Sequence, residues 1–257
     1  MQSLLRELHQ KATQTPEPGS LPLLIGDIAC GCLSVRAIEV IHAHRPDVIT
    51  KGNIQIPLSN SLTAELGDIA TWLYDAGCIP KWRNELLDVW RENNAIAAIE
   101  RGAVRPLGLL TRAVHLNAWS KHGELWVARR ALNKPTDPGM WDTLVGGLVG
   151  HGEPDDLALE RETEEEAGLS ARDIAKREPI RSIFRMQRRV DEGFQCEEVL
   201  TSDCVLSETA IPQNQDGEVM QIACLSVPEI EAMLFDGAFT LEASIVIAES
   251  LLRHRPH

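Results

Sequence analysis

The stretch from residue 147 to residue 169, GLVGHGEPDDLALERETEEEAGL, constrains the fold more than any other part of the chain. Pro154 suits the first turn of a helix, where its missing N–H needs no partner, and the two aspartates that follow complement the positive end of the helix dipole. Gly168 is placed to adopt the left-handed conformation that ends many helices. The sequence therefore predicts a helix that begins near residue 154 and ends before Gly168.

The carboxylates of this predicted helix share one face. Glu162, Glu165 and Glu166 are spaced as i, i+3 and i+4, and each like-charged i,i+4 pair destabilises a helix by about 0.2–0.5 kcal/mol. Arg161 can neutralise only part of this charge, whereas a hard divalent cation prefers oxygen ligands and would reverse the local field. A solvated acidic face is the usual explanation of a charge run, so the spacing alone leaves both interpretations open.

Eight residues of this stretch resemble the Nudix box. That pattern is glycine, five residues, Glu, seven residues, Arg-Glu, an aliphatic residue, one residue, Glu-Glu, one residue, glycine and an aliphatic residue. The matching residues are Gly147, Glu153, Arg161, Glu162, Glu165, Glu166, Gly168 and Leu169. Thr163 stands where an aliphatic residue is usual, a departure that concerns helix packing rather than metal binding. The length of the match favours the metal site over the solvated face.

The resemblance implies metal-assisted attack of water on a diphosphate. Its implied metal is Mg²⁺, or Mn²⁺ in its place, held by carboxylates and one backbone carbonyl. The implied ligands are Gly147, Glu162, Glu165 and Glu166. Glu162 and Glu166 are the preferred direct ligands, and Glu165 or Glu218 would deprotonate or orient the water. Glu198 is a weaker candidate for a further carboxylate.

Other residues near the box have supporting roles in this interpretation. Glu153 and Arg161 are expected to form an ion pair that fixes the loop against the helix. A site that grips a diphosphate also needs cations, and the nearest candidates in sequence are Arg129, Arg130 and Lys134. A solvated strand end and loop would explain the same three residues equally well.

The chain of 257 residues, 44% of them hydrophobic, is long enough for two modest domains. We expect a small α+β companion domain over residues 1–108 and a Nudix domain over residues 109–257, with the α/β/α sandwich and mixed sheet that the resemblance implies. No catalytic grouping is visible before residue 110, so the first domain is interpreted as a companion. A Trp-rich patch at residues 82–90 is expected to supply core or interface.

Hydrophobic periodicity predicts the elements of both domains. In the first domain we expect helices over residues 4–11, 35–43 and 60–75 and a hairpin within residues 21–33. In the second we expect strands over residues 113–119, 124–130, 180–189, 197–205 and 219–225. Two helices, over residues 228–235 and 242–253, are expected to complete it.

Charge and cysteine content narrow the classes of partner. The net charge of −13 argues against a nucleic-acid polymer or an anionic membrane as the main partner. The first twenty residues lack an unbroken apolar core, so neither a signal peptide nor a membrane anchor is expected and the protein should be cytoplasmic. Six scattered cysteines are expected to be reduced and mostly buried. The expected partner is a small-molecule diphosphate, and a homodimer remains open.

The run LWVARRALNKPTDPGMWDTLVGG resembles one branch of the Nudix family, in which a small N-terminal domain precedes the hydrolase domain. That branch includes plant and yeast proteins related to thiamine pyrophosphokinase, which implies hydrolysis of thiamine diphosphate or its damaged, oxidised analogues to the monophosphate. Nucleoside triphosphates, ADP-ribose, dinucleotides and coenzyme A remain alternative substrates. A non-catalytic ligand-sensing module and isopentenyl diphosphate isomerase are rival functions, although the isomerase needs a cysteine near residues 144–147 and none stands there.

Overall fold

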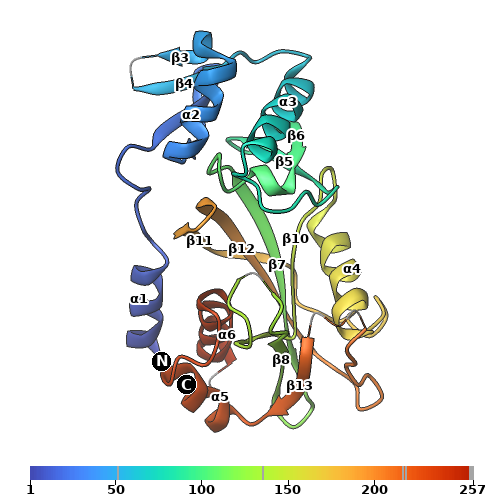
Figure 1. Ribbon diagram of the computed structural model, residues 1–257. Helices are drawn as coiled ribbons and strands as arrows, with labels where there is room; N and C mark the ends of the chain where they lie inside the picture. Colours follow the sequence, from blue (N-terminus) through green and yellow to red (C-terminus); the bar gives the residue numbers. More distant parts are fainter. Residues whose placement is uncertain (51, 135, 216, 218, 255–257) are drawn as a thin grey trace.

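The structure, a computed structural model, describes residues 1–50, 52–134, 136–215, 217 and 219–254 (Figure 1). It has a smaller α+β part built around α2 and α3 and a larger part built around a long mixed sheet. This mixed α/β architecture confirms the predicted fold class.

The first half of the chain contains three α-helices and six strands among its described residues. They are α1 (Gln2–Lys11), β1 (Leu21–Ile25), β2 (Ile28–Leu33), α2 (Val35–His44), β3 (Ile49–Thr50), β4 (Asn53–Ile56), α3 (Leu62–Asp75), β5 (Leu86–Arg91) and β6 (Asn94–Glu100). Two short 3-10 turns, η1 (Pro46–Val48) and η2 (Arg101–Ala103), complete this half.

The smaller part packs around one apolar core. Its four-stranded sheet has the order β2-β1-β4-β3, and the separate hairpin β5–β6 lies beside α3. The predicted apolar stripe of α3 is buried throughout, as the periodicity required. The β5–β6 hairpin was not predicted, because buried Asp88 interrupts the apolar alternation of β5 and Glu92 makes the turn with a left-handed φ of 56°.

The second half supplies the larger sheet and its helices. They are β7 (Leu110–Trp119), β8 (Leu125–Arg130), β9 (Trp141–Thr143), β10 (Val145–Leu148), α4 (Asp155–Ala167), β11 (Arg181–Val190), β12 (Gly193–Val205), β13 (Val219–Leu225), α5 (Val227–Phe235) and α6 (Leu241–His254). These elements confirm the predicted strands and helices, although β12 begins four residues earlier than expected.

The larger sheet has the order β11-β12-β7-β8-β13, with β10 beside β7 and β9 beside β8. β12 runs parallel to β7 and the other pairs are antiparallel, so the sheet is mixed. α4 packs against β10 and β7, whereas α6 covers the opposite face (Figure 1). The result is the α/β/α sandwich that the resemblance implied.

The position of α1 differs from the expected domain division, which counted residues 1–108 together. α1 packs against α6, and its Leu8 joins a cluster with Met186 and Ile245 of the larger part (Figure 1). The backbone of Gln187 also exchanges hydrogen bonds with the segment that follows α1. The chain therefore starts on the larger part, crosses to the smaller part and returns at β7.

The cysteines are less buried than expected. All six are free thiols, but only Cys78 and Cys204 are buried and the other four are half-buried. Burial raises the pKa of each thiol, which keeps it protonated and unreactive. Within the described part of the chain, no helix combines the length and apolarity needed to cross a membrane.

The two parts meet where β2 crosses the segment that leads into β7. The amide of Cys32 donates to the carbonyl of Leu107 at 3.0 Å. Gly31 and Gly108 allow this approach: a Cβ on Gly31 would lie 2.4 Å from the Leu107 carbonyl oxygen, and one on Gly108 would lie 2.3 Å from that of Cys32. Backbone packed this closely fixes β2 against the segment that leads into β7.

This junction predicts opposite effects for two glycine substitutions. We expect Gly108→Ala to lower the free energy of unfolding by at least about 2 kcal/mol, because the residue has a φ of 57° and its Cβ would meet backbone. Gly67→Ala is the control, since Gly67 lies within helix α3 with no atom within 4 Å of its added Cβ. It should stabilise by about 0.5–1 kcal/mol. Urea unfolding measures both, and equal effects would contradict the account of the junction.

Candidate functional site

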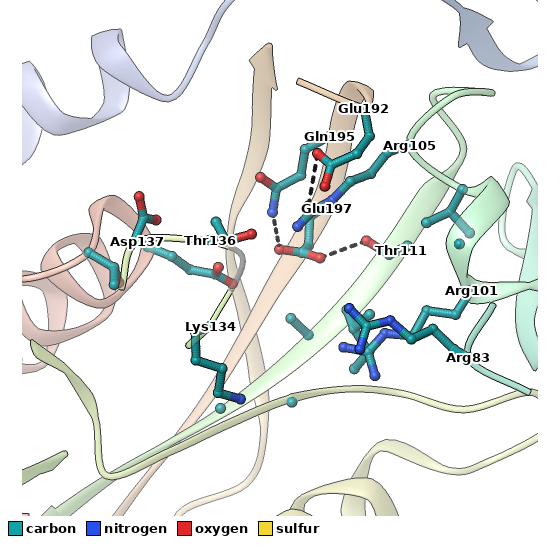
Figure 2. Close-up of a pocket in the computed structure, with 18 of the residues that line it drawn as sticks. Arg83, Arg101, Arg105, Thr111, Lys134, Thr136, Asp137, Glu192, Gln195 and Glu197 are labelled. Atoms are coloured by element: carbon teal, nitrogen blue, oxygen red, sulfur yellow. Dashed lines mark hydrogen bonds and ion pairs between the residues drawn. The ribbon is translucent and has the colours of Figure 1, made fainter. Parts of the chain in front are cut away.

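A cavity of about 730 Å³ opens between the two parts of the molecule (Figure 2). Its walls come from residues 80–105 of the smaller part and from β7, β10, α4, β12 and the start of α6 in the larger part. The lining is mostly polar and charged, so this cavity is suited to an ionic ligand rather than an apolar one.

Glu162 and Glu166 of α4 lie in the cavity wall beside β10. A Cβ on Gly147 would lie 1.9 Å from the Glu162 carboxyl carbon, so a glycine is required for α4 and β10 to approach this closely. The preceding residue on the strand anchors the second carboxylate, because the amide of Gly146 donates to Glu166 Oε2 at 3.0 Å. The first glycine of the box therefore makes room for the helix that carries the box carboxylates.

The surroundings of these two carboxylates disfavour their negative charge. Removal from water, together with neighbouring Glu162 and Asp142, raises the pKa of Glu166 to about 8 against the hydrogen bond from Gly146. Burial also raises the pKa of Glu162, although Arg161 opposes that shift. Two carboxylates that resist ionisation side by side favour the binding of a cation between them.

Arg161 forms the expected brace between helix and loop. Its Nε donates to Glu153 Oε1 and its Nη2 to Glu153 Oε2, both at 2.9 Å. Nη2 also donates to the Leu148 carbonyl at 3.2 Å. Glu153 in turn accepts the Gly150 amide at 3.0 Å. The paired guanidinium holds the pKa of Glu153 below its usual value. This network pins the loop that follows β10 to α4.

Glu165 occupies a different position from its two partners. Its side chain is 55% exposed and lies 3.2 Å from Arg161 Nη1, outside the set of residues that line the cavity. The helix therefore presents Glu162 and Glu166 to the cavity and turns Glu165 toward solvent. Thr163, where an aliphatic residue is usual, is fully buried and donates its hydroxyl to the Leu159 carbonyl, so its polarity is satisfied within the helix.

Two carboxylates of the cavity wall are suited to a divalent cation. Among the described residues, no three His, Cys, Asp or Glu side chains are assembled around one point. Glu162 and Glu166 nevertheless provide hard carboxylate oxygens on one wall, and Mg²⁺ is commonly held by one or two carboxylates together with waters and substrate phosphates. The pair fits such an ion. Glu218, the further carboxylate suggested by the sequence, lies outside the described residues.

The three cationic side chains expected near the box do not lie together in the structure. Arg130 and Lys134 line the cavity, and Arg130 pairs with Asp142 at 3.0 Å. Arg129 lies on the other face of β8, where its Nε donates to the Gly139 carbonyl at 2.9 Å and its guanidinium lies over the Trp141 ring. Successive side chains of a strand point to opposite faces, which places these neighbours in different surroundings.

The sequence missed a buried carboxyl group on β12. Glu197 lines the cavity and accepts hydrogen bonds from Thr111 and Gln195, both at 2.7 Å (Figure 2). Glu198, the candidate chosen from the sequence, instead lies 3.7 Å from Arg185. Strand alternation decides between the two neighbours, but the sequence alone does not show which face of β12 meets the cavity.

Glu197 belongs to a hydrogen-bonded network of titratable side chains that includes Glu242 of α6. His115 Nε2 lies 2.8 Å from Glu242, which also shares a hydrogen bond with Glu197. Burial alone would lower the pKa of His115, but Glu242 outweighs it and raises the pKa to about 8. Burial and the negative Glu242 raise the pKa of Glu197. The arrangement thus favours the charged forms of His115 and Glu242 and disfavours the charged form of Glu197.

The smaller part contributes four cationic side chains to the same cavity: Lys81, Arg83, Arg101 and Arg105. The sequence showed no catalytic grouping before residue 110, and no motif marks the arginines, because they reach the cavity only through the position of the smaller part next to β7 (Figure 2). Residues of the predicted companion domain therefore form part of the cavity wall.

The raised pKa of Glu166 predicts how stability changes with pH. A carboxyl whose pKa is raised from 4.5 to about 8 in the folded state favours folding at low pH, and this contribution is lost as pH rises through about 8. The free energy of unfolding of the metal-free protein should therefore fall more steeply between pH 5 and pH 8 than that of Glu166→Gln. Mg²⁺ should stabilise most at the upper end, because it binds the ionised form.

Glu164→Gln provides the control for this pH series, because Glu164 is an exposed glutamate on the same helix. Its slope should match that of the wild type in thermal unfolding at each pH. Parallel slopes for Glu166→Gln and the wild type would show that Glu166 ionises normally.

Comparison with known proteins identifies relatives over most of the chain. Nudix hydrolase 20, chloroplastic, from Arabidopsis thaliana is 33% identical over 208 residues, which cover 79% of this chain and 55% of that protein. Nudix hydrolase 24, chloroplastic, from the same plant is 32% identical over 79% of this chain and 57% of that protein. The chain thus spans little more than half the length of either relative. An isopentenyl-diphosphate Delta-isomerase from Agromyces mediolanus is 30% identical over 54% of this chain and 68% of that protein.

The NUDIX domain family matches residues 109–243. The matched region contains the mixed sheet, the braced helix α4 and the carboxylates that face the cavity, which are the features that the box predicted. The match extends over more than half of the 257 residues, and on this basis the chain belongs to the NUDIX domain family.

Proposed function

We propose that this protein hydrolyses a diphosphate linkage with the help of a divalent cation, releasing a monophosphate and phosphate. The observation that carries the proposal is the placement of Glu162 and Glu166 in the wall of a 730 Å³ cavity that Arg130 and Lys134 also line. Carboxylates for a metal and cations for phosphate oxygens are the two requirements of this chemistry.

The residues of the site would have different roles in this hydrolysis. Glu162 and Glu166 would hold the cation, which when bound supplies positive charge to the phosphate oxygens and a more acidic water. Arg130 and Lys134 would orient the diphosphate from the loop side. Arg161 Nη1 would hold Glu162 in place through an ion pair of 2.7 Å. The same guanidinium also pairs with the exposed Glu165, whose negative charge offsets part of its positive charge.

We further propose thiamine diphosphate, or a damaged analogue of it, as the substrate. Besides the resemblance of the branch, the support is the carboxyl pair of buried Glu197 and half-buried Glu242, which both line the cavity. Thiamine carries a cationic ring and an aminopyrimidine that donates hydrogen bonds, and such groups complement carboxyl oxygens. The alternative, a nucleoside diphosphate derivative such as ADP-ribose, lacks a matching positive charge.

The two rival functions fit the site less well. Residues 144–147 hold no thiol for an isomerase, and Cys196, which lines the cavity, has a pKa raised by burial. A ligand-sensing module would not need two carboxylates whose charge is so disfavoured, because they cost stability without a metal.

A panel of substrates tests the proposal directly. Release of phosphate or monophosphate is measured from thiamine diphosphate, its oxidised analogues, ADP-ribose and nucleoside triphosphates, first with Mg²⁺ and then with EDTA. Metal-dependent turnover that prefers the thiamine compounds supports both levels of the proposal. Preference for another diphosphate overturns the substrate alone, and no turnover of any member overturns the hydrolase.

The two orientations of the box glutamates predict unequal losses of activity. Glu166→Gln should lower kcat by more than about 100-fold, because it removes a cation ligand inside the cavity without changing shape. Glu165→Gln alters an exposed side chain and should cost less than about tenfold. Steady-state kinetics at saturating Mg²⁺, with melting temperatures to confirm folding, separates the two, and equal losses would contradict the geometry.

A further inference from the structure

Three arginines of the smaller part line the cavity, and Arg105 pairs with Glu192 at 3.4 Å. The other two, Arg83 and Arg101, lie on the wall opposite the loop that carries Lys134 (Figure 2). Arg83 lies in the segment before β5, and Arg101 is the first residue of η2. Both side chains are half-buried, so they belong to the wall rather than to the outer surface.

One buried carboxylate fixes the backbone beneath both arginines. Glu100 is only 3% exposed, and its Oε1 accepts the amide of Arg83 at 2.7 Å and that of Gly102 at 3.4 Å. A Cβ on Gly102 would lie 2.5 Å from Ile79, so the two segments approach as closely as glycine allows. The backbone that carries the two arginines is therefore held by the buried Glu100 of the smaller part.

The guanidinium groups retain most of their hydrogen-bonding capacity. Within the described residues, none accepts a hydrogen bond from the Arg83 guanidinium. Arg101 Nη1 lies 2.6 Å from Glu85, whose side chain is 53% exposed at the rim. Each guanidinium carries five N–H donors in a planar fork, so several donors per arginine remain for a ligand.

The arginines face the box. Arg101 is close enough to interact electrostatically with Glu162, and both line the same cavity. Two guanidinium groups on one wall repel each other unless an anion lies between them, and the planar fork matches the oxygens of phosphate. In a chain with a net charge of −13, this local positive wall is an exception that calls for an anionic ligand.

We propose that Arg83 and Arg101 bind the phosphate groups of the diphosphate substrate, so that the smaller part completes the substrate site of the Nudix domain. The inference rests on the proposed function for the identity of the ligand as a diphosphate. The substrate is then held from two sides, with Arg130 at the end of β8 and Lys134 on the following loop on one side and the arginine pair of the smaller part on the other.

Binding of inorganic pyrophosphate to the full chain tests the pair without requiring turnover. Isothermal titration calorimetry, with and without Mg²⁺, compares the wild type with Arg83→Gln, Arg101→Gln and the double variant. We expect Kd to rise about tenfold in each single variant and about 100-fold in the double variant, since each loses a charge-assisted, forked contact. With a turned-over diphosphate, KM should rise by similar factors while kcat changes less.

Two further variants separate a phosphate contact from a general effect of charge or folding. Arg36→Gln removes the same charge from an exposed position of α2 outside the cavity and should leave Kd unchanged. Arg83→Lys keeps the charge but loses the fork, so it should restore only part of the affinity. Melting temperatures establish whether each variant is folded. If the double variant does not fold, the single variants alone decide the test.

The outcomes distinguish this inference from the proposed function. Unchanged Kd and KM in folded Arg83→Gln and Arg101→Gln overturn the arginine pair, while wild-type hydrolysis would still support the hydrolase. Pyrophosphate binding that depends on both arginines, without turnover of any diphosphate, supports the pair and overturns the hydrolase. Equal weakening by Arg36→Gln also overturns the inference, because the effect would then be one of net charge.

Discussion

The structure depends on the close approach of α4 to β10, where the carboxylate of Glu162 lies against the backbone of Gly147. No other residue type leaves room at that position, and the Arg161–Glu153 pair holds the two elements together around it. The contact places two carboxylates where water is partly excluded and their charge is disfavoured. The helix is thus held in an arrangement that only a cation would relieve.

The cavity is lined by charged side chains from distant parts of the sequence. Carboxylates of α4 lie on one side, the chain of His115, Glu242 and Glu197 lies on another, and arginines of the smaller part close the third. Such a cavity is charged with both signs in separate regions. Charges separated in this way would complement a molecule with an anionic end and a cationic or hydrogen-bonding end, as in the proposed substrate.

The sequence predicted what local spacing determines. The box helix, its left-handed end at Gly168 and the ion pair of Glu153 with Arg161 follow from residues close together in the chain. The cavity could not be predicted in this way, because Glu197 rather than Glu198 faces it only through the register of β12, and Arg83 reaches it only through the junction of two parts. The hairpin β5–β6 was missed because a buried aspartate interrupts its pattern.

The position of α1 on α6 changes the description of the smaller part from an appended domain to an insertion. Its chain leaves the sandwich after α1 and re-enters at β7, so two covalent tethers and the glycine junction restrict its rotation. Cutting the connector at residues 13–20 would still leave one tether. Evolutionary or engineered loss of the insertion would have to excise an internal segment and reseal α1 to β7, because truncation from the amino terminus would strip a helix from the sandwich itself.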